Sequence, residues 1–193
     1  MSFSRARRVG ESADRFKCSE ISTLRTRGES TATFPCEECD AVKVENDGQI
    51  VAICIASEVG VEAHEIDEVI ATAGAGLKGD RYFAQGADAE TQVTLIELEA
   101  IESFNSVLGL DLAPRMFRRN LVTRSVRLND LVGRSFSVGE ATLRGVELCE
   151  PCAYLQDLLA VPSLVKHLTH RGGLRCEILT GGTLRVGDRI KAA

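Results

Sequence analysis

The pattern of hydrophobic and polar positions changes near residue 48. From Gln49 onward, apolar side chains recur with the alternation expected of β-strands. Within residues 50–57, the even-numbered and the odd-numbered positions are both mostly apolar, which predicts a central strand buried on both faces. Similar patterns predict further short strands at residues 69–72, 92–95, 121–124, 135–138, 141–148, 174–179, 183–186 and 189–191. Residues 92–95 are also compatible with the approach to a helix.

A few segments have the period of a helix instead. One apolar stripe at helical spacing consists of Leu98, Ile101, Phe104, Val107 and Leu108. We expect a helix packed on the sheet there, with Thr94 and Glu97 as a capping box and Gly109 just after its last turn. Shorter helices are predicted at residues 154–160 and 163–169. Many short strands with few helices predict a mainly β fold, arranged as a closed or partly closed β-barrel, because closure removes exposed strand edges.

Residues 1–47 show no sustained period. The segment is basic and rich in Ser and Thr, and it carries too few apolar side chains to offset the entropy of ordering it. We therefore expect a flexible N-terminal extension at 1–47 and one folded domain at 48–193. A transit peptide is an alternative, although Glu11, Asp14, Glu20 and Glu29 are unusual for one.

Composition narrows the class of protein. A length of 193 residues with 44% hydrophobic content suits one large domain, and the net charge of −5 argues against a nucleic-acid partner. No apolar run approaches the roughly 18 residues that a membrane-spanning helix needs. Seven cysteines cannot all pair internally, and no secretory signal pattern precedes them. We expect a cytoplasmic protein with free thiols.

The segment Cys149-Glu150-Pro151-Cys152 holds the most informative pair of thiols. Pro151 cannot continue a strand ladder, so the strand at 141–148 must end before it. Cys152 then lies beyond the strand end, where a thiolate can act as a nucleophile, a sulfur carrier or a ligand to a soft metal. The plain alternative is that both thiols are small apolar side chains.

Several cationic or glycine-rich segments could bind an anion. The loop with Lys78 and Arg81 is glycine-rich, so its backbone can approach a phosphate closely. Of Arg118 and Arg119, adjacent at a strand start, we expect only Arg119 to face the pocket, with Asn120 supplying amide hydrogen bonds. Arg171 and Gly172 follow a short helix and suit the open rim of an anion site.

Taken in order, these segments resemble a known family. They are Gly76-Leu77-Lys78-Gly79-Asp80-Arg81, Phe117-Arg118-Arg119-Asn120-Leu121-Val122, Leu128-Asn129-Asp130-Leu131-Val132-Gly133, Phe136-Ser137-Val138-Gly139, the Cys149–Cys152 segment, His170-Arg171-Gly172-Gly173-Leu174-Arg175 and Thr183-Leu184-Arg185-Val186-Gly187-Asp188-Arg189-Ile190. The order and spacing over roughly residues 48–191 resemble the MOSC domain, named for the C-terminal domain of molybdenum cofactor sulfurases.

The resemblance implies a β-barrel with a pocket for a pterin-type molybdenum cofactor. It implies that basic residues hold the phosphate and that Cys152, which follows the proline, carries sulfur or contacts the metal. The chain would then be a molybdenum-cofactor-binding or sulfur-carrier protein, or the catalytic module of a small molybdenum-dependent reductase. The family is also linked to cysteine desulfurases, which use pyridoxal phosphate. No segment of this chain matches their larger domain, so that cofactor would belong to a partner, and an electron-donor protein is the other candidate partner.

Two alternatives from other classes remain open. Cys36 and Cys39 form a second C-x-x-C pair, which could join Cys149 and Cys152 in a four-cysteine zinc site. A dithiol binding module without catalysis is the other. For the favoured hypothesis, we expect Lys78, Arg81, Arg119 and Arg171 to converge on one pocket with Cys152. We also expect Cys152 to be the most reactive thiol, and Cys54 and Cys176 to be inert on core strands.

Overall fold

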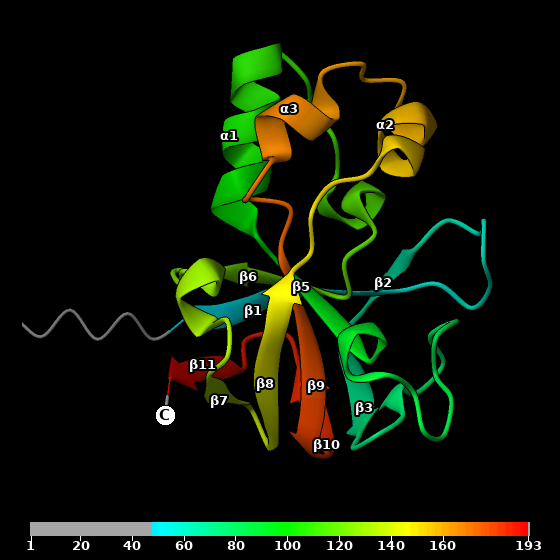
Figure 1. Cartoon of the computed structure of the whole chain (residues 1–193), viewed down its shortest axis with the longest axis vertical. Helices are drawn as coiled ribbons and strands as arrows, with labels where there is room; N and C mark the ends of the chain where they lie inside the picture. The colour runs from blue at the N-terminus through cyan, green and yellow to red at the C-terminus, as the bar shows by residue number, and fades with distance from the viewer. Residues whose placement is uncertain (1–47, 193) are drawn as a thin grey trace, which may run out of the picture. The chain divides into compact units, whose positions relative to one another are not determined.

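A computed structural model describes residues 48–192, and these residues form a β-rich unit with three short α-helices (Figure 1). The predicted extension at 1–47 lies outside the described residues. The strands are β1 (Gly48–Ile55), β2 (His64–Ile66), β3 (Glu68–Thr72), β4 (Gly76–Leu77), β5 (Val93–Glu97), β6 (Leu121–Arg124), β7 (Ser135–Val138), β8 (Ala141–Leu148), β9 (Leu174–Thr180), β10 (Gly182–Arg185) and β11 (Arg189–Ala192). The helices are α1 (Leu98–Leu108), α2 (Ala153–Leu159) and α3 (Leu164–Leu168).

Seven of the strands close into a barrel. The order β11-β7-β8-β9-β5-β6-β1 is completed by antiparallel pairing of β1 with β11, and β2 extends from β1 outside the ring. Only the β5–β6 pair of the ring is parallel. Strands β10, β3 and β4 form a separate small sheet. The predicted mainly β fold with a closed barrel is therefore confirmed.

Two apolar clusters explain why β1 is apolar on both faces. Ile50 and Ile53 belong to the cluster inside the barrel, and both face inward because the pairing of β1 with β6 shifts register between Ile50 and Ala52. Cys54 and Ala56 belong to a second cluster, which lies beneath the helices. In Figure 1 the three helices gather at one end of the barrel, above β1, β5 and β6. The predicted central strand is confirmed.

The predicted helix at 98–108 is confirmed, but its predicted N-terminal cap is wrong. Gly109 follows the last turn with φ 66°, a left-handed conformation that suits glycine. Thr94, however, lies in β5, and its hydroxyl donates to Asn120 Oδ1 at 2.9 Å. Glu97 occupies the N-cap without a side-chain cap, and its carboxylate accepts from the Leu128 amide at 2.8 Å. Val107 is exposed, so the buried stripe is narrower than predicted.

None of the helices within residues 48–192 is long and apolar enough to cross a membrane.

Candidate functional site

A cavity of about 280 Å³ lies between one end of the barrel and α2. Barrel strands β5 and β9 supply Thr94 and Arg175 to its wall, and the start of α2 supplies Tyr154 and Leu155. Thr91 comes from the 3-10 helix Ala89–Thr91, and the remaining lining residues lie between helices and strands: Val59, Arg81, Tyr82, Arg118, Arg119, Asn120, Cys149 and Cys152. We call this the arginine cavity.

The charge of the arginine cavity has one sign. Arg81, Arg118, Arg119 and Arg175 line it, and no Asp or Glu of the described chain does. Arg81 and Arg175 have carboxylate partners that do not line the cavity, Asp80 at 3.8 Å and Glu147 at 3.4 Å. A hollow lined by several guanidinium groups favours an anion, because each group presents N–H donors in a geometry that matches phosphate or carboxylate.

Arg119 is fixed at the inner wall by backbone carbonyls. It donates through Nε to Gly172 at 2.8 Å, through Nη1 to Phe117 at 3.3 Å and through Nη2 to Cys149 at 3.1 Å. Within residues 48–192 no carboxylate pairs with it. Burial lowers the pKa of Arg119 below its ordinary value, and Arg175 and Arg81 act in the same direction. Its charge is therefore held in place by the dipoles of backbone carbonyls, without a carboxylate counter-charge among the described residues.

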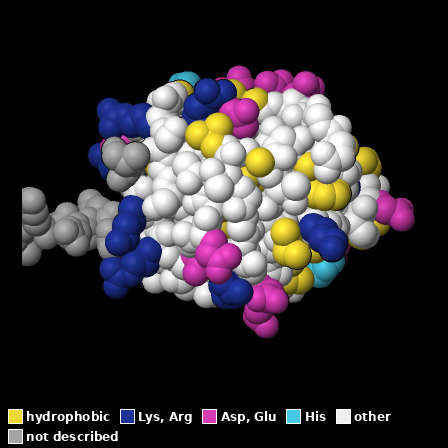
Figure 2. Space-filling model, turned by 90° about the horizontal axis from the view of Figure 1, so that it is seen from below, with side chains coloured by type: hydrophobic (Ala, Val, Ile, Leu, Met, Phe, Trp, Pro, Cys, Tyr) yellow, Lys and Arg dark blue, Asp and Glu magenta, His cyan; other side chains and the backbone are white. Residues whose placement is uncertain are grey.

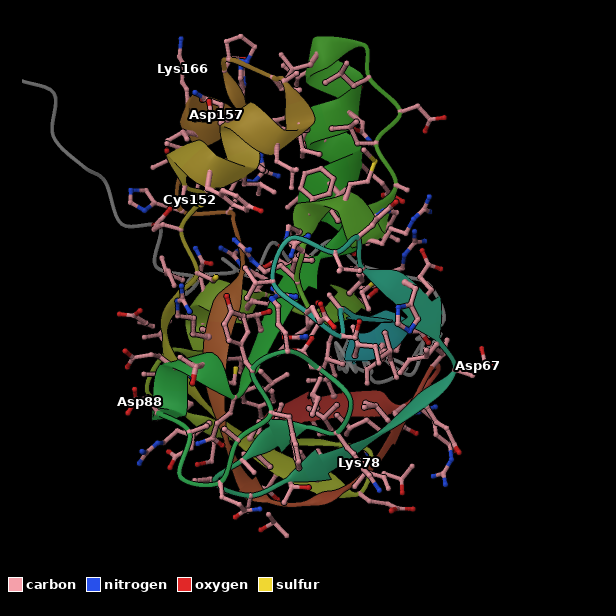
Figure 3. All side chains as sticks on the ribbon, turned by 90° about the vertical axis from the view of Figure 1, so that its right-hand side faces the viewer. Asp67, Lys78, Asp88, Cys152, Asp157 and Lys166 are labelled. Carbon is pink, nitrogen blue, oxygen red and sulfur yellow. The ribbon has the colours of Figure 1, made fainter. Side chains whose placement is uncertain are left out.

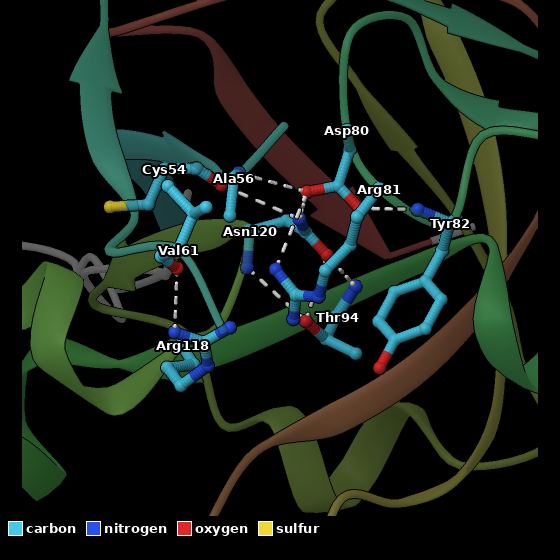
Figure 4. Close-up of polar contacts among 9 residues, drawn as sticks. All are labelled: Cys54, Ala56, Val61, Asp80, Arg81, Tyr82, Thr94, Arg118 and Asn120. Atoms are coloured by element: carbon cyan, nitrogen blue, oxygen red, sulfur yellow. Dashed lines mark hydrogen bonds and ion pairs between the residues drawn. The ribbon is translucent and has the colours of Figure 1, made fainter. Parts of the chain in front are cut away.

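A buried network anchors the loop that carries Arg81 (Figure 4). Asp80 accepts from the backbone amides of Ala56 and Tyr82, and from Asn120 Nδ2, each at 3.2 Å. Asn120 Oδ1 in turn accepts from the Thr94 amide and hydroxyl. The guanidinium of Arg81 lies 4.6 Å from the ring centre of Tyr82. Asn120 is therefore mainly a structural link, because its amide is used within the protein.

The two thiols of the Cys149–Cys152 segment have opposite surroundings. Cys149 is buried and its amide donates to the Gly173 carbonyl at 2.8 Å. Cys152 is exposed, directly precedes α2 with extended backbone at φ −123° and ψ 163°, and lines the arginine cavity. The predicted position of Cys152, in a cleft beyond a strand end, is confirmed.

The other two described cysteines lie in the core, as predicted. Cys54 on β1 and Cys176 on β9 are almost fully buried. Burial raises the pKa of Cys54 to about 12, and the nearby Glu65 acts in the same direction. Burial also raises the pKa of Cys176. Both thiols stay protonated at neutral pH, which makes them poor nucleophiles.

Gly172, predicted as a binding residue, does not line the arginine cavity but has a packing role next to it. Its carbonyl accepts the Nε–H of Arg119, and a Cβ at this position would lie 2.6 Å from the Cys149 carbonyl oxygen and 2.9 Å from Pro151. Only glycine lets the two segments approach this closely. Glu150 adds a further link, since its carboxylate contacts the amide and Nδ1 of His170, both at 2.8 Å.

The predicted convergence of four cations is correct for Arg81 and Arg119 and wrong for Lys78 and Arg171. Lys78 follows β4, whose pairing with β3 directs it to a hollow on the small sheet that includes Glu68 and Arg185. Figure 3 shows Lys78 near the opposite end of the unit from Cys152. That lower end carries basic and acidic side chains around its edge (Figure 2).

Arg171 lies outside the arginine cavity because the backbone turns just before it. His170 is left-handed with φ 60°, and Arg171 then extends toward α1, where its Nη1 lies 3.5 Å from Ser103 Oγ. Arg171 lines a separate hollow with Glu97, Arg127 and Asn129.

The expectation that only one of Arg118 and Arg119 faces the pocket is also wrong. The two residues precede β6, and Arg118 has φ 58° and ψ 34° at the end of the 3-10 helix Pro114–Phe117. Strand alternation therefore does not apply to it. Arg175 was missed as well. Arg175 precedes Cys176 on β9, and Cys176 faces the core. Strand alternation could therefore have predicted that the Arg175 side chain points away from the core, toward the cavity.

The proposed four-cysteine zinc site depends on Cys36 and Cys39, which lie outside the described residues. Within residues 48–192, no three His, Cys, Asp or Glu side chains gather closely enough to hold a metal ion by themselves.

Solved structures share this fold. The YUAD protein from Bacillus subtilis is 17% identical with a TM-score of 0.67, and the match covers 75% of this chain and 94% of that one. YiiM from Geobacillus stearothermophilus is 16% identical with a TM-score of 0.64, covering 76% and 75%. YiiM from Escherichia coli is 18% identical with a TM-score of 0.57, covering 75% and 69%. At these identities the likeness concerns the fold alone.

The family is shown by the sequence itself. The family model for the MOSC domain matches residues 77–191. The chain belongs to the MOSC domain family, which is associated with functions related to the molybdenum cofactor. No curated protein matches the chain.

Proposed function

We propose that this protein binds a phosphorylated, pterin-type molybdenum cofactor in the arginine cavity, with Cys152 beside it as a ligand to the metal or as a carrier of sulfur. One observation supports this above others. Four arginines line a cavity without acidic residues in its described wall, and an exposed thiol lies in the same wall. Family membership supports the same ligand.

The residues fit the chemistry of that ligand. Arg119 and Arg118 have no carboxylate partner in the described part of the chain, so both can donate to a phosphate. The Tyr82 hydroxyl adds a neutral donor at the wall, whereas the Thr91 hydroxyl already donates to the Asp88 carbonyl at 2.9 Å. A thiolate at Cys152 is a soft ligand of the kind that suits a thiophilic metal. When bound, the cofactor would supply redox chemistry that these side chains lack.

The carrier role needs only Cys152 and a partner protein. The Cys152 thiolate attacks the outer sulfur of a persulfide on the partner, the partner's S–S bond breaks, and the partner leaves as a thiolate. Cys152 then holds the sulfur as its own persulfide. A cysteine desulfurase is the partner that we propose for this role, and an electron-donor protein is the partner for a reductase module.

We also propose a reducing compartment such as the cytoplasm. The four cysteines within residues 48–192 are all free thiols, which supports this location.

The test is to purify the native protein under reducing conditions and analyse what is bound to it. We expect molybdenum by elemental analysis and a pterin by absorbance and mass, or a mass increase of one sulfur atom on Cys152. Cys152→Ser should abolish the bound metal or the persulfide, whereas the matched variant Cys149→Ser should retain at least part of it. Protein that carries neither, after expression in a host that makes the cofactor, would contradict the proposal.

A further inference from the structure

A second hollow, of about 260 Å³, lies beside the arginine cavity and shares Arg118 with it. Its other lining residues are Gly60, Glu62, Ala63, Arg115, Met116, Leu158 and Leu159. The charges of Glu62 and Arg115 are paired at 3.3 Å. The hollow is therefore mainly apolar, with Arg118 as its one lining cation that lacks a carboxylate partner within the described range.

The two hollows are parts of one groove. Tyr154 and Leu155 of α2 line the arginine cavity, and Leu158 and Leu159, four residues further on, line the second hollow. Residues four apart lie on the same side of a helix. The loop after β1 follows the same course, since Val59 lines the first hollow and Gly60 the second. The groove is thus cationic at the start of α2 and apolar at its end.

Arg118 is fixed at the boundary between the two ends. Its backbone amide donates to Arg115 and its Nη1 donates to the Val61 carbonyl at 3.0 Å (Figure 4). A guanidinium has five N–H donors, and within residues 48–192 this is the only hydrogen bond that the Arg118 side chain makes. The remaining donors can therefore bind a ligand that occupies the apolar end.

We propose that the apolar end is a substrate subsite for a small organic acid whose body is a short alkyl chain or one aromatic ring. The apolar body packs on Met116, Leu158 and Leu159, and its anionic end binds Arg118. That end then lies at the edge of the cavity that Cys152 lines. The inference rests on the proposed function for any chemistry at Cys152, whereas binding of the acid does not require it.

Met116 provides a direct probe of this hollow. The chain has only two methionines, and Met116 is the one within the described residues. Full-length protein labelled at the methionine methyl groups is titrated with hexanoate, and with hexylammonium as a control of equal length and opposite charge. We expect a saturable shift of the Met116 methyl signal with hexanoate and none with hexylammonium. Equal responses to the two compounds would overturn the proposal.

Matched variants test the apolar contact. Leu158→Ser should weaken hexanoate binding about fivefold to tenfold, because the leucine contributes apolar surface. Leu179→Ser, at a similarly exposed leucine near the end of β9, should leave the affinity unchanged. Arg118→Asn keeps a residue that tolerates the left-handed backbone and should remove the preference for the anion. An unchanged affinity in Leu158→Ser would overturn the proposal.

Failure of this inference and failure of the proposed function are distinguishable. Inorganic pyrophosphate is titrated into the same variants as a probe of the arginine cavity. If Leu158→Ser loses hexanoate binding but keeps pyrophosphate binding, the two ends of the groove are separate subsites as proposed. If native protein carries no molybdenum, pterin or persulfide but binds hexanoate as described, only the proposed function fails. A common loss of both probes in Leu158→Ser would contradict separate subsites.

Discussion

Cys149 and Cys152 show how far two thiols three residues apart can differ. Residues 149–152 form neither a turn nor a bend, so the chain runs on from β8 to α2. Three extended residues span up to about 10 Å, whereas the Cα atoms of a disulfide are about 4.4–6.8 Å apart. A disulfide between them would need a local rearrangement. The arrangement therefore favours two separate roles over a dithiol pair.

The first prediction concerns the reactivity of these thiols. Brief alkylation at neutral pH should label Cys152 ahead of Cys54, Cys149 and Cys176, because Cys152 alone of the four is exposed. Peptide mass mapping after a time course measures the order. Comparable labelling rates for Cys149 and Cys152 would leave only a structural role for both.

Arg119 lines the arginine cavity and also has a structural role, which its sequence context does not reveal. Its three acceptor carbonyls belong to Phe117, Cys149 and Gly172, all buried residues from different segments. A buried carbonyl that loses its donor costs free energy, because water cannot fully replace the hydrogen bond. The residue therefore holds the cavity wall together as well as charging it.

The second prediction follows from that structural role. Arg119→Ala should lower the free energy of unfolding by about 2–3 kcal/mol and should also remove anion binding. Arg118→Ala is the matched neighbour and should cost less than about 1 kcal/mol, since its single carbonyl partner is on an exposed residue. Urea denaturation followed by circular dichroism measures both. Equal losses of unfolding free energy in the two variants would show that the three hydrogen bonds from Arg119 to backbone carbonyls contribute little to stability.

At the scale of elements, local patterns were sufficient for most strands. The predicted bounds of β6, β7 and β8 agree with the structure, because each has a regular alternation and ends at a turn residue or proline. The short strands β2 and β4 were not predicted, since two or three residues carry no recognisable period. The 3-10 helix before Arg118 was also missed, and with it the orientation of that side chain. Sequence reasoning therefore failed mainly where the backbone is irregular.

Gly173 gives the third prediction, at the loop that joins α3 to β9. It has φ 119°, and a Cβ there would collide with the Leu95 carbonyl oxygen and come within 3.4 Å of Arg119 Nε. Gly173→Ala should lower the melting temperature strongly and reduce anion binding, because Leu95 and Arg119 must move.

A second glycine serves as a control, because it distinguishes the steric clash of an added Cβ from the cost of a positive φ for an L-residue. Gly133 also has positive φ, 75°, but no atom lies within 4 Å of its hypothetical Cβ. Gly133→Ala should cost only about 1–2 kcal/mol, the preference of an L-residue against this conformation. Differential scanning calorimetry on both variants makes the comparison. Similar losses in the two would mean that the close approach at Gly173 is easily relieved.

At the scale of the whole molecule, the fold of the barrel determines which charged side chains lie close together. The sequence predicted that Arg81 and Arg119 would line one pocket with Cys152, and the structure places them so. The sequence could not tell that β4 takes Lys78 to the small sheet, or that the turn at His170 takes Arg171 toward α1. Those outcomes depend on strand pairing and on backbone conformation between distant segments, which periodicity along one segment does not contain.

The last prediction tests which arginines contribute to the arginine cavity. It compares two arginines that lie four residues apart, on either side of Gly172 and Gly173. Arg175 lines the arginine cavity and Arg171 does not. Arg175→Gln should weaken pyrophosphate binding about tenfold, since it removes one charged donor from the site. Arg171→Gln removes the same charge from the chain and should change the affinity less than twofold. Isothermal titration calorimetry at low and at physiological salt gives both values, and the difference between the variants should persist at higher salt, because direct contacts are screened less than long-range attraction. Equal losses in the two variants would mean that net charge, and not the arginine cavity, binds the anion.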